Sequence, residues 1–267
     1  MLKYSFFLAC MLLLSAPAYA SVSMTYPADA TLSDGASVQA GFVSPGQAFN
    51  LGFSNDSGHG YKWDSITIEQ SSLPAGWKIV SINKTDPSLV ASIKVPTNAP
   101  PNIYLLRVSL SNSSQPESLE QIEVRVIVKR NLLDVSFARK STEETQLLGG
   151  KAIYNLKLTN SSIAPFSVKI GSTLPSNWFS EKSVEIKPNT SQDLELVITP
   201  LSSGKFQFSF QAFAGEDNLI VKSYASELNV RPTLKGKFGS PLSGFPFFTF
   251  TLLPFQLADS FLSLVLP

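Results

Sequence analysis

Side chains able to act as nucleophiles or general bases are scarce in this chain of 267 residues. It contains one histidine, His59, and one cysteine, Cys10. Nucleophilic catalysis needs a base held firmly beside the nucleophile. Because His59 lies between two glycines, it is typical of a surface loop, and no G-x-S-x-G turn accompanies it. We therefore expect no nucleophilic catalysis.

Metal-assisted and glycosidic chemistry have equally little support. A zinc site needs three or four His, Cys or carboxylate ligands, and the first two types are nearly absent. The chain has no D-x-D-x-D-G calcium loop and no glycine-rich phosphate loop. The acidic pairs Glu143–Glu144 and Glu216–Asp217 lie in polar connections, where carboxylates are usually solvated. We expect no enzyme activity, no cofactor and no metal site.

The charge balance bears on the partners. Lys and Arg total 21 and Asp and Glu total 20, so the net charge is +1. Nucleic-acid binding needs a basic excess to neutralise phosphates. We therefore expect no nucleic-acid partner.

Residues 1–20 have the pattern of an export signal. Lys3 precedes the apolar run of residues 6–14, and the segment ends in Ala18-Tyr19-Ala20, which suits a signal peptidase. Cleavage would leave Ser21 as the first residue. Since Cys10 lies in the removed segment, the mature chain would have no cysteine and could form no disulfide.

Residues 21–232 read as an all-β chain. Apolar and polar residues alternate with the period of a half-buried strand, and Pro, Gly, Asn and Ser gather between these runs. The alternating apolar sets include Phe49, Leu51 and Phe53; Ile122, Val124, Val126 and Val128; Tyr154, Leu156 and Leu158; and Phe206, Phe208 and Phe210. Many short strands at this spacing are typical of a sandwich or barrel.

The same pattern occurs twice, about one hundred residues apart. The strand at 48–55 matches that at 152–160, and an L-P-x-x-W motif occurs at 73–77 and 174–178. A strand ending at Pro96 matches one ending at Pro200, and 104–110 matches 206–213. We predict sandwich domains at 21–129 and 130–232, with Trp77 and Trp178 in their cores.

The second copy also resembles a known family. Its strand ending in Asn160, its L-P-S-N-W motif, the V-E-I-K-P step at 184–188 and the G-K-F start at 204–206 are similar to the immunoglobulin-like domains associated with bacterial α-galactosidases. The first copy lacks a clear V-x-I-x-P step. The resemblance implies tandem immunoglobulin-like sandwiches on an exported surface protein, with spacing, display and accessory binding roles. It brings no catalytic residues.

Residues 233–267 form an apolar tail with one charge, Asp259, after Lys237. The tail could be a transmembrane anchor over 245–266, an amphipathic helix starting near Pro254, or an apolar segment that docks on its own domain or on a partner subunit. We favour a short amphipathic helix that docks on a membrane or a partner. The docking residues would be Phe245, Phe247, Phe248, Phe250, Leu257, Phe261, Leu264 and Val265.

Two further groups of residues are candidates for contacts with sugars. Glycosylation sequons begin at Asn55, Asn83, Asn112, Asn160 and Asn189. Aromatic rings that could stack on a bound glycan are those of Tyr61, Trp63 and Trp77.

The sequence thus predicts a non-catalytic, exported protein of the cell surface or periplasm, associated with a membrane. Its work would be display, adhesion or assembly, and its partners an envelope protein or the membrane itself. A carbohydrate-binding accessory module, or a periplasmic chaperone that pairs an open sheet edge with its clients, are the alternatives.

Overall fold

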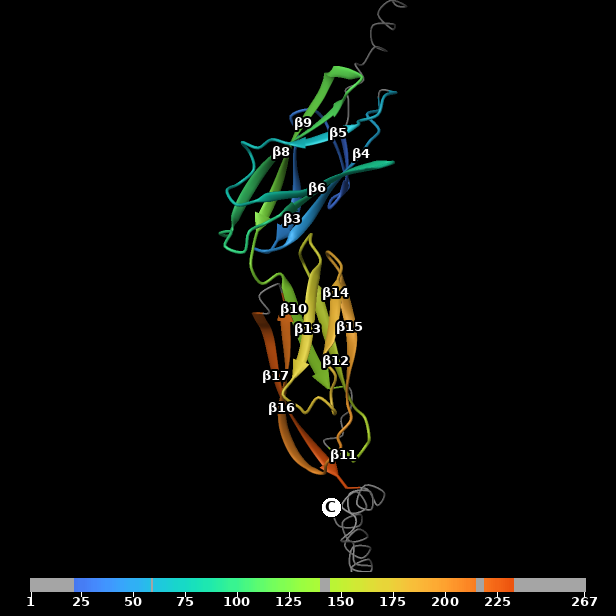
Figure 1. The fold of residues 1–267 in the computed structure, drawn as a ribbon, viewed down its shortest axis with the longest axis vertical. Helices are drawn as coiled ribbons and strands as arrows, with labels where there is room; N and C mark the ends of the chain where they lie inside the picture. The colour runs from blue at the N-terminus through green and yellow to red at the C-terminus, as the bar shows by residue number, and fades with distance from the viewer. Residues whose placement is uncertain (1–21, 59, 140–144, 215–218, 233–267) are drawn as a thin grey trace, which may run out of the picture. The chain divides into compact units, whose positions relative to one another are not determined.

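The computed structural model describes residues 22–58, 60–139, 145–214 and 219–232 (Figure 1). All regular secondary structure in these residues is β-strand, which confirms the predicted all-β fold class. The export signal, His59, both acidic pairs and the apolar tail with its docking residues lie outside the described residues.

The chain divides into two compact units. Unit 1 runs up to Leu132 and includes Ser162–Ala164, and unit 2 comprises Leu133–Ser161 and the chain from Pro165 onward. Ile163 and Ala164 accordingly belong to the buried core of unit 1. Each unit is built from two sheets.

In unit 1 the first sheet has the strand order β2 (Ala30–Leu32), β1 (Val22–Tyr26), β4 (Ala48–Ser54), β7 (Ser88–Lys94) and β6 (Lys78–Thr85). Its second sheet has the order β3 (Ser37–Val43), β9 (Gln115–Val128), β8 (Asn102–Asn112) and β5 (Ser65–Ile68). Strand β3 pairs parallel with β9, and the other pairings are antiparallel.

In unit 2 the first sheet has the order β10 (Leu133–Arg139), β12 (Ala152–Asn160) and β15 (Ser191–Ile198). The second has the order β11 (Thr145–Leu147), β17 (Leu219–Arg231), β16 (Gly204–Ala214), β13 (Phe166–Ser172) and β14 (Lys182–Ile186). Strand β11 pairs parallel with β17, as β3 does with β9. The two units are therefore immunoglobulin-like sandwiches that share most of their strand pairings.

One strand changes sheets between the units. In unit 1, β6 pairs with β7 at the edge of the first sheet. Its counterpart in unit 2, β14, pairs with β13 at the edge of the second sheet. As a result β7 has a neighbour on both sides, whereas its counterpart β15 is an edge strand.

The alternating residues fill the space between the sheets, as their period predicts. In unit 1 the core contains the alternating residues of β4 and β9, which are Phe49, Leu51, Phe53, Ile122, Val124, Val126 and Val128. In unit 2 the Tyr154 ring on β12 meets the rings of Phe208 and Phe210 on β16 edge to face, with centroids 5.9 and 5.2 Å apart. Contacts between aromatic rings of the two facing sheets therefore form part of the core of unit 2.

Both copies of the L-P-x-x-W motif make the same turn. The amide of Trp77 donates to the Pro74 carbonyl, and that of Trp178 to the Pro175 carbonyl. Each indole then packs against an aromatic ring at the start of a matched strand, Tyr104 (5.2 Å between centroids) or Phe206 (4.7 Å). Both tryptophans are buried, which confirms their predicted core role.

Candidate interaction surfaces

Three connections meet at one end of unit 1: residues 55–58 and 60–64 between β4 and β5, 86–87 between β6 and β7, and 113–114 between β8 and β9. We call this the loop end. The backbone amide of Asn55 donates to the Pro87 carbonyl (2.9 Å), and that of Asp64 to the Ser111 carbonyl (3.1 Å). Backbone hydrogen bonds therefore join the first connection to the second and to the end of β8.

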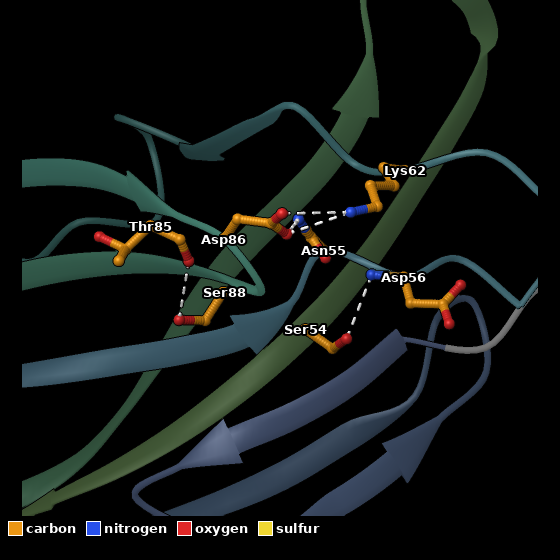
Figure 2. A network of polar contacts seen from close by, with 7 residues as sticks. All are labelled: Ser54, Asn55, Asp56, Lys62, Thr85, Asp86 and Ser88. Atoms are coloured by element: carbon orange, nitrogen blue, oxygen red, sulfur yellow. Dashed lines mark hydrogen bonds and ion pairs between the residues drawn. The ribbon is translucent and has the colours of Figure 1, made fainter.

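A polar network centred on Asp86 lies at the loop end (Figure 2). The side-chain amide of Asn55 donates to Asp86 Oδ1 at 2.7 Å, and Lys62 Nζ lies 3.1 Å from the same oxygen. The hydrogen bond from Asn55, and then that from Lys62, hold the pKa of Asp86 below its ordinary value. Asn55 is buried while Asp86 and Lys62 are largely exposed, so the network anchors surface charges to the sandwich.

Asp64 forms a second, separate contact. Its carboxylate accepts hydrogen bonds from the backbone amide of Ser113 (3.0 Å) and from the Ser113 hydroxyl. These two bonds lower the pKa of Asp64. The carboxylates of the loop end are thus occupied by partners from the protein itself. No group of three or more metal-binding side chains occurs within the described residues.

Of the three aromatic residues predicted to stack on a glycan, the two tryptophans are packed inward. The Trp63 side chain is 0% exposed and meets the Tyr61 ring edge to face, with centroids 5.2 Å apart. Trp77 is 5% exposed. A ring that stacks on a sugar must present a face to solvent. The glycan-stacking expectation is therefore corrected for Trp63 and Trp77, and of the three rings only the partly buried Tyr61 retains exposed surface.

Three of the five sequon asparagines are structural. Asn55 is bonded to Asp86, as described above. The Asn112 amide donates to the Lys62 carbonyl (2.6 Å), and its oxygen accepts from the amide of Ser114 (2.7 Å). The Asn160 amide donates to the carbonyls of Ile186 (3.2 Å) and Lys187 (3.0 Å).

These three side chains are buried, and their amide nitrogens are already hydrogen-bonded. A glycan needs an asparagine nitrogen open to solvent. The glycosylation expectation is therefore corrected for Asn55, Asn112 and Asn160 in the folded chain. Asn83 and Asn189 are exposed, so the expectation stays a prediction for these two.

The outer face of the sheet β3-β9-β8 carries an apolar patch that the sequence analysis missed. Phe42 on β3 pairs with Ile127 on β9, which pairs with Ile103 on β8, and Leu105 lies two residues along β8. We call these four residues the apolar row. Ile103 is 56% exposed, and Leu105 and Phe42 are exposed as well. Since cross-strand neighbours lie about 5 Å apart, their side chains form one surface.

Polar residues border the apolar row on the same face. Arg107 on β8 forms ion pairs with Glu69 (3.6 Å) and with Glu123 on β9 (3.7 Å). One signal in the sequence was Ile127, the only apolar residue among the outward positions Glu123, Arg125, Ile127 and Lys129 of that strand. A single apolar residue on a strand is too common to predict a patch.

No family profile and no curated protein matches this chain. Similar solved structures include fibronectin(III)-like modules of Clostridium thermocellum CbhA, with 13% identity over 79% of this chain and 94% of that one and a TM-score of 0.30. Another is the pair of tandem Ig repeats of Dlar, with 10% identity, 80% and 99% coverage and a TM-score of 0.28. The D00–D0 domain of intimin has 12% identity, 78% and 96% coverage and a TM-score of 0.27. At such low scores we draw no inference from these likenesses.

In the part of the chain that the structure describes, no helix is long and apolar enough to cross a membrane.

Replacing Asn160 with alanine should destabilise unit 2. The carbonyls of Ile186 and Lys187 would lose their donor, and a buried unsatisfied group costs about 1–3 kcal/mol. Chemical denaturation followed by circular dichroism measures the change. Asn83→Ala, which alters an exposed sequon, is the control and should change the free energy of unfolding by less than about 0.5 kcal/mol. Equal effects of both variants would contradict a structural role for Asn160.

The Asp86 network should stabilise unit 1 in a pH-dependent way. Because the pKa of Asp86 is lowered in the folded protein, its contribution is present above the unfolded pKa and lost as the pH falls through the folded value. Asp86→Asn should therefore lower the free energy of unfolding at pH 7 more than at pH 3.

Urea denaturation at both pH values tests this prediction, with Asp134→Asn, an exposed residue on β10 of unit 2, as the control. A difference between wild type and Asp86→Asn that stays constant from pH 7 to pH 3 would contradict it.

Proposed function

We propose that the protein is a non-catalytic, exported component of the cell envelope. Its two immunoglobulin-like sandwiches display a protein-binding face, and residues 233–267 hold the chain to a membrane or a partner. Export is supported by residues 1–20, where Lys3, the apolar run and the Ala18-Tyr19-Ala20 ending have the pattern of a signal peptide.

The apolar row is the observation that carries the binding role. Its exposed residues Phe42, Ile103 and Leu105 come from two strands and share one face with Ile127. A contiguous apolar surface with a polar border is typical of a protein–protein contact. A rigid sheet also holds these side chains in place, so that binding would cost little ordering entropy.

The burial of the aromatic rings favours a protein partner over a glycan. Trp63 and Trp77 would be the best stacking platforms, but both lie in the core of unit 1. The carboxylates of Asp64 and Asp86 are bonded within the loop end and are poorly placed to orient a sugar. The apolar row, by contrast, offers its surface to solvent.

Pairing of a client strand with β6 has weaker support. In the described residues β6 pairs only with β7, and Val80 and Ile82 on it are exposed. The strand also carries Lys78 and Lys84. Lysines on edge strands discourage the addition of another strand.

A photo-crosslinking residue at Ile103 should form an adduct with another protein in cells that export the full chain. The side chain lies in the apolar row, so a partner bound there would be within reach of the crosslinker. Gel electrophoresis followed by mass spectrometry detects the adduct.

Val80 is the matched control. Its side chain is 59% exposed, close to the 56% of Ile103, but it lies on the other sheet of unit 1. A second substitution, Leu105→Ser, places a polar side chain in the apolar row and should abolish the adduct at position 103. Adducts at both positions, or at neither, would contradict a specific contact at the apolar row.

Deletion of residues 233–267 should release the protein from membranes. The deleted segment contains the apolar residues 245–253 and one charge beyond Lys237, and burial of apolar surface drives such binding. Fractionation of cells expressing the full chain or a chain ending at Pro232 measures the release. Circular dichroism of the released protein checks that it is folded. A full-length chain found in the soluble exported fraction would contradict the anchoring role.

A further inference from the structure

The end of unit 2 from which the tail departs is defined by three hydrogen-bonded segments. Leu147 on β11 is the register partner of Arg231 on β17, and the amide of Leu148 donates to the Arg231 carbonyl (2.9 Å). The amide of Gly149 donates to the carbonyl of Pro200 (2.9 Å). We call this region, residues 147–151, 199–205 and 229–232, the exit end. Pro232 is the last described residue before the apolar tail.

Two exposed leucines lie at the exit end. Leu147 is 57% exposed, and Leu201, which follows Pro200, is 53% exposed. Because the Gly149–Pro200 hydrogen bond joins their two segments, both leucines belong to one region of the surface. Exposed leucines that stand beside the start of an apolar segment extend its apolar surface.

The exit end also bears unpaired positive charge. Lys151, Lys205 and Arg231 are exposed, and none of them forms an ion pair with another described residue. Lys205 lies beside Asn229 in the same sheet that holds Arg231. Glu227, two residues before Asn229 on β17 and opposite Gln207, is the acidic residue of that strand nearest to the exit end.

We propose that the exit end is a contact surface for an anionic lipid bilayer. Leucines that enter the region between headgroups and acyl chains, with Lys and Arg beside them at the phosphates, are the pattern of an interfacial membrane contact. The tail begins at this surface, so a tail bound to the membrane would bring the exit end within reach of the headgroups. This inference rests on the membrane form of the proposed function.

A single labelled cysteine tests the contact. The chain from Ser21 onward has no cysteine, so Leu201→Cys in the chain 21–267 provides the only thiol for an environment-sensitive fluorophore. Vesicles of phosphatidylcholine with phosphatidylglycerol are then added. We expect the emission at position 201 to shift to the blue and to be quenched by nitroxide lipids in the headgroup region.

Val221→Cys is the matched control. Val221 is also an exposed apolar residue of unit 2, but it lies near the start of β17, at the opposite end of that strand from Arg231. Its label should keep the emission it has in water. A second set of variants, Lys151→Gln, Lys205→Gln and Arg231→Gln, should each lower the partition coefficient on anionic vesicles roughly fivefold, because each cation near an anionic surface adds a similar increment. Circular dichroism checks that each variant is folded.

The outcomes separate this inference from the proposed function. If the chain binds vesicles while the label at 201 stays in water and the glutamine variants bind like wild type, the exit-end contact is overturned and the anchor survives. If the label at 201 is shielded from aqueous iodide without vesicles, the chain's own tail covers the site and the lipid contact is also overturned. If the chain fails to bind any vesicle, the exit-end contact and the membrane form of the proposed function are both overturned.

Discussion

Packing of apolar side chains between two sheets holds each unit together. The chain has a single cysteine, Cys10, so no intrachain disulfide can reinforce either sandwich. In unit 1 the Trp77 ring meets Phe49 and Tyr104, and in unit 2 Tyr154 meets two phenylalanines of the facing sheet. The apolar row and the loop end lie on the strands of unit 1 and their connections, so their rigidity depends on this packing.

Features that depend on local periodicity could be predicted from the sequence. Residues such as Leu156 and Leu158 alternate with polar ones, and a period of two leaves a strand only one way to bury its apolar face. The repeat added a second constraint, because Trp77 and Trp178 follow the same Leu-Pro pair in both copies. A role in the core explains both copies at once, and the structure agrees.

Features that depend on distant partners could not be predicted. The sequon at Asn160 is a local pattern, whereas its burial depends on the carbonyl of Ile186, which is 26 residues away. Ile103 and Leu105 look like ordinary strand residues until Phe42 and Ile127 are brought beside them by the pairing of three strands. The V-x-I-x-P step that the first copy lacks falls at β14, but this mismatch alone could not show that β6 and β14 join different sheets.

That change of sheet has a consequence for folding. Neighbouring domains with similar sequences can exchange equivalent segments and become trapped in domain-swapped misassemblies. For β14 to take the place of β6, it would have to leave β13 and pair with β7. Strand β13 belongs to the second sheet of unit 2, whereas β7 belongs to the first sheet of unit 1, so the pairing partners are not equivalent. The two strands are therefore poor substitutes for each other in such an exchange.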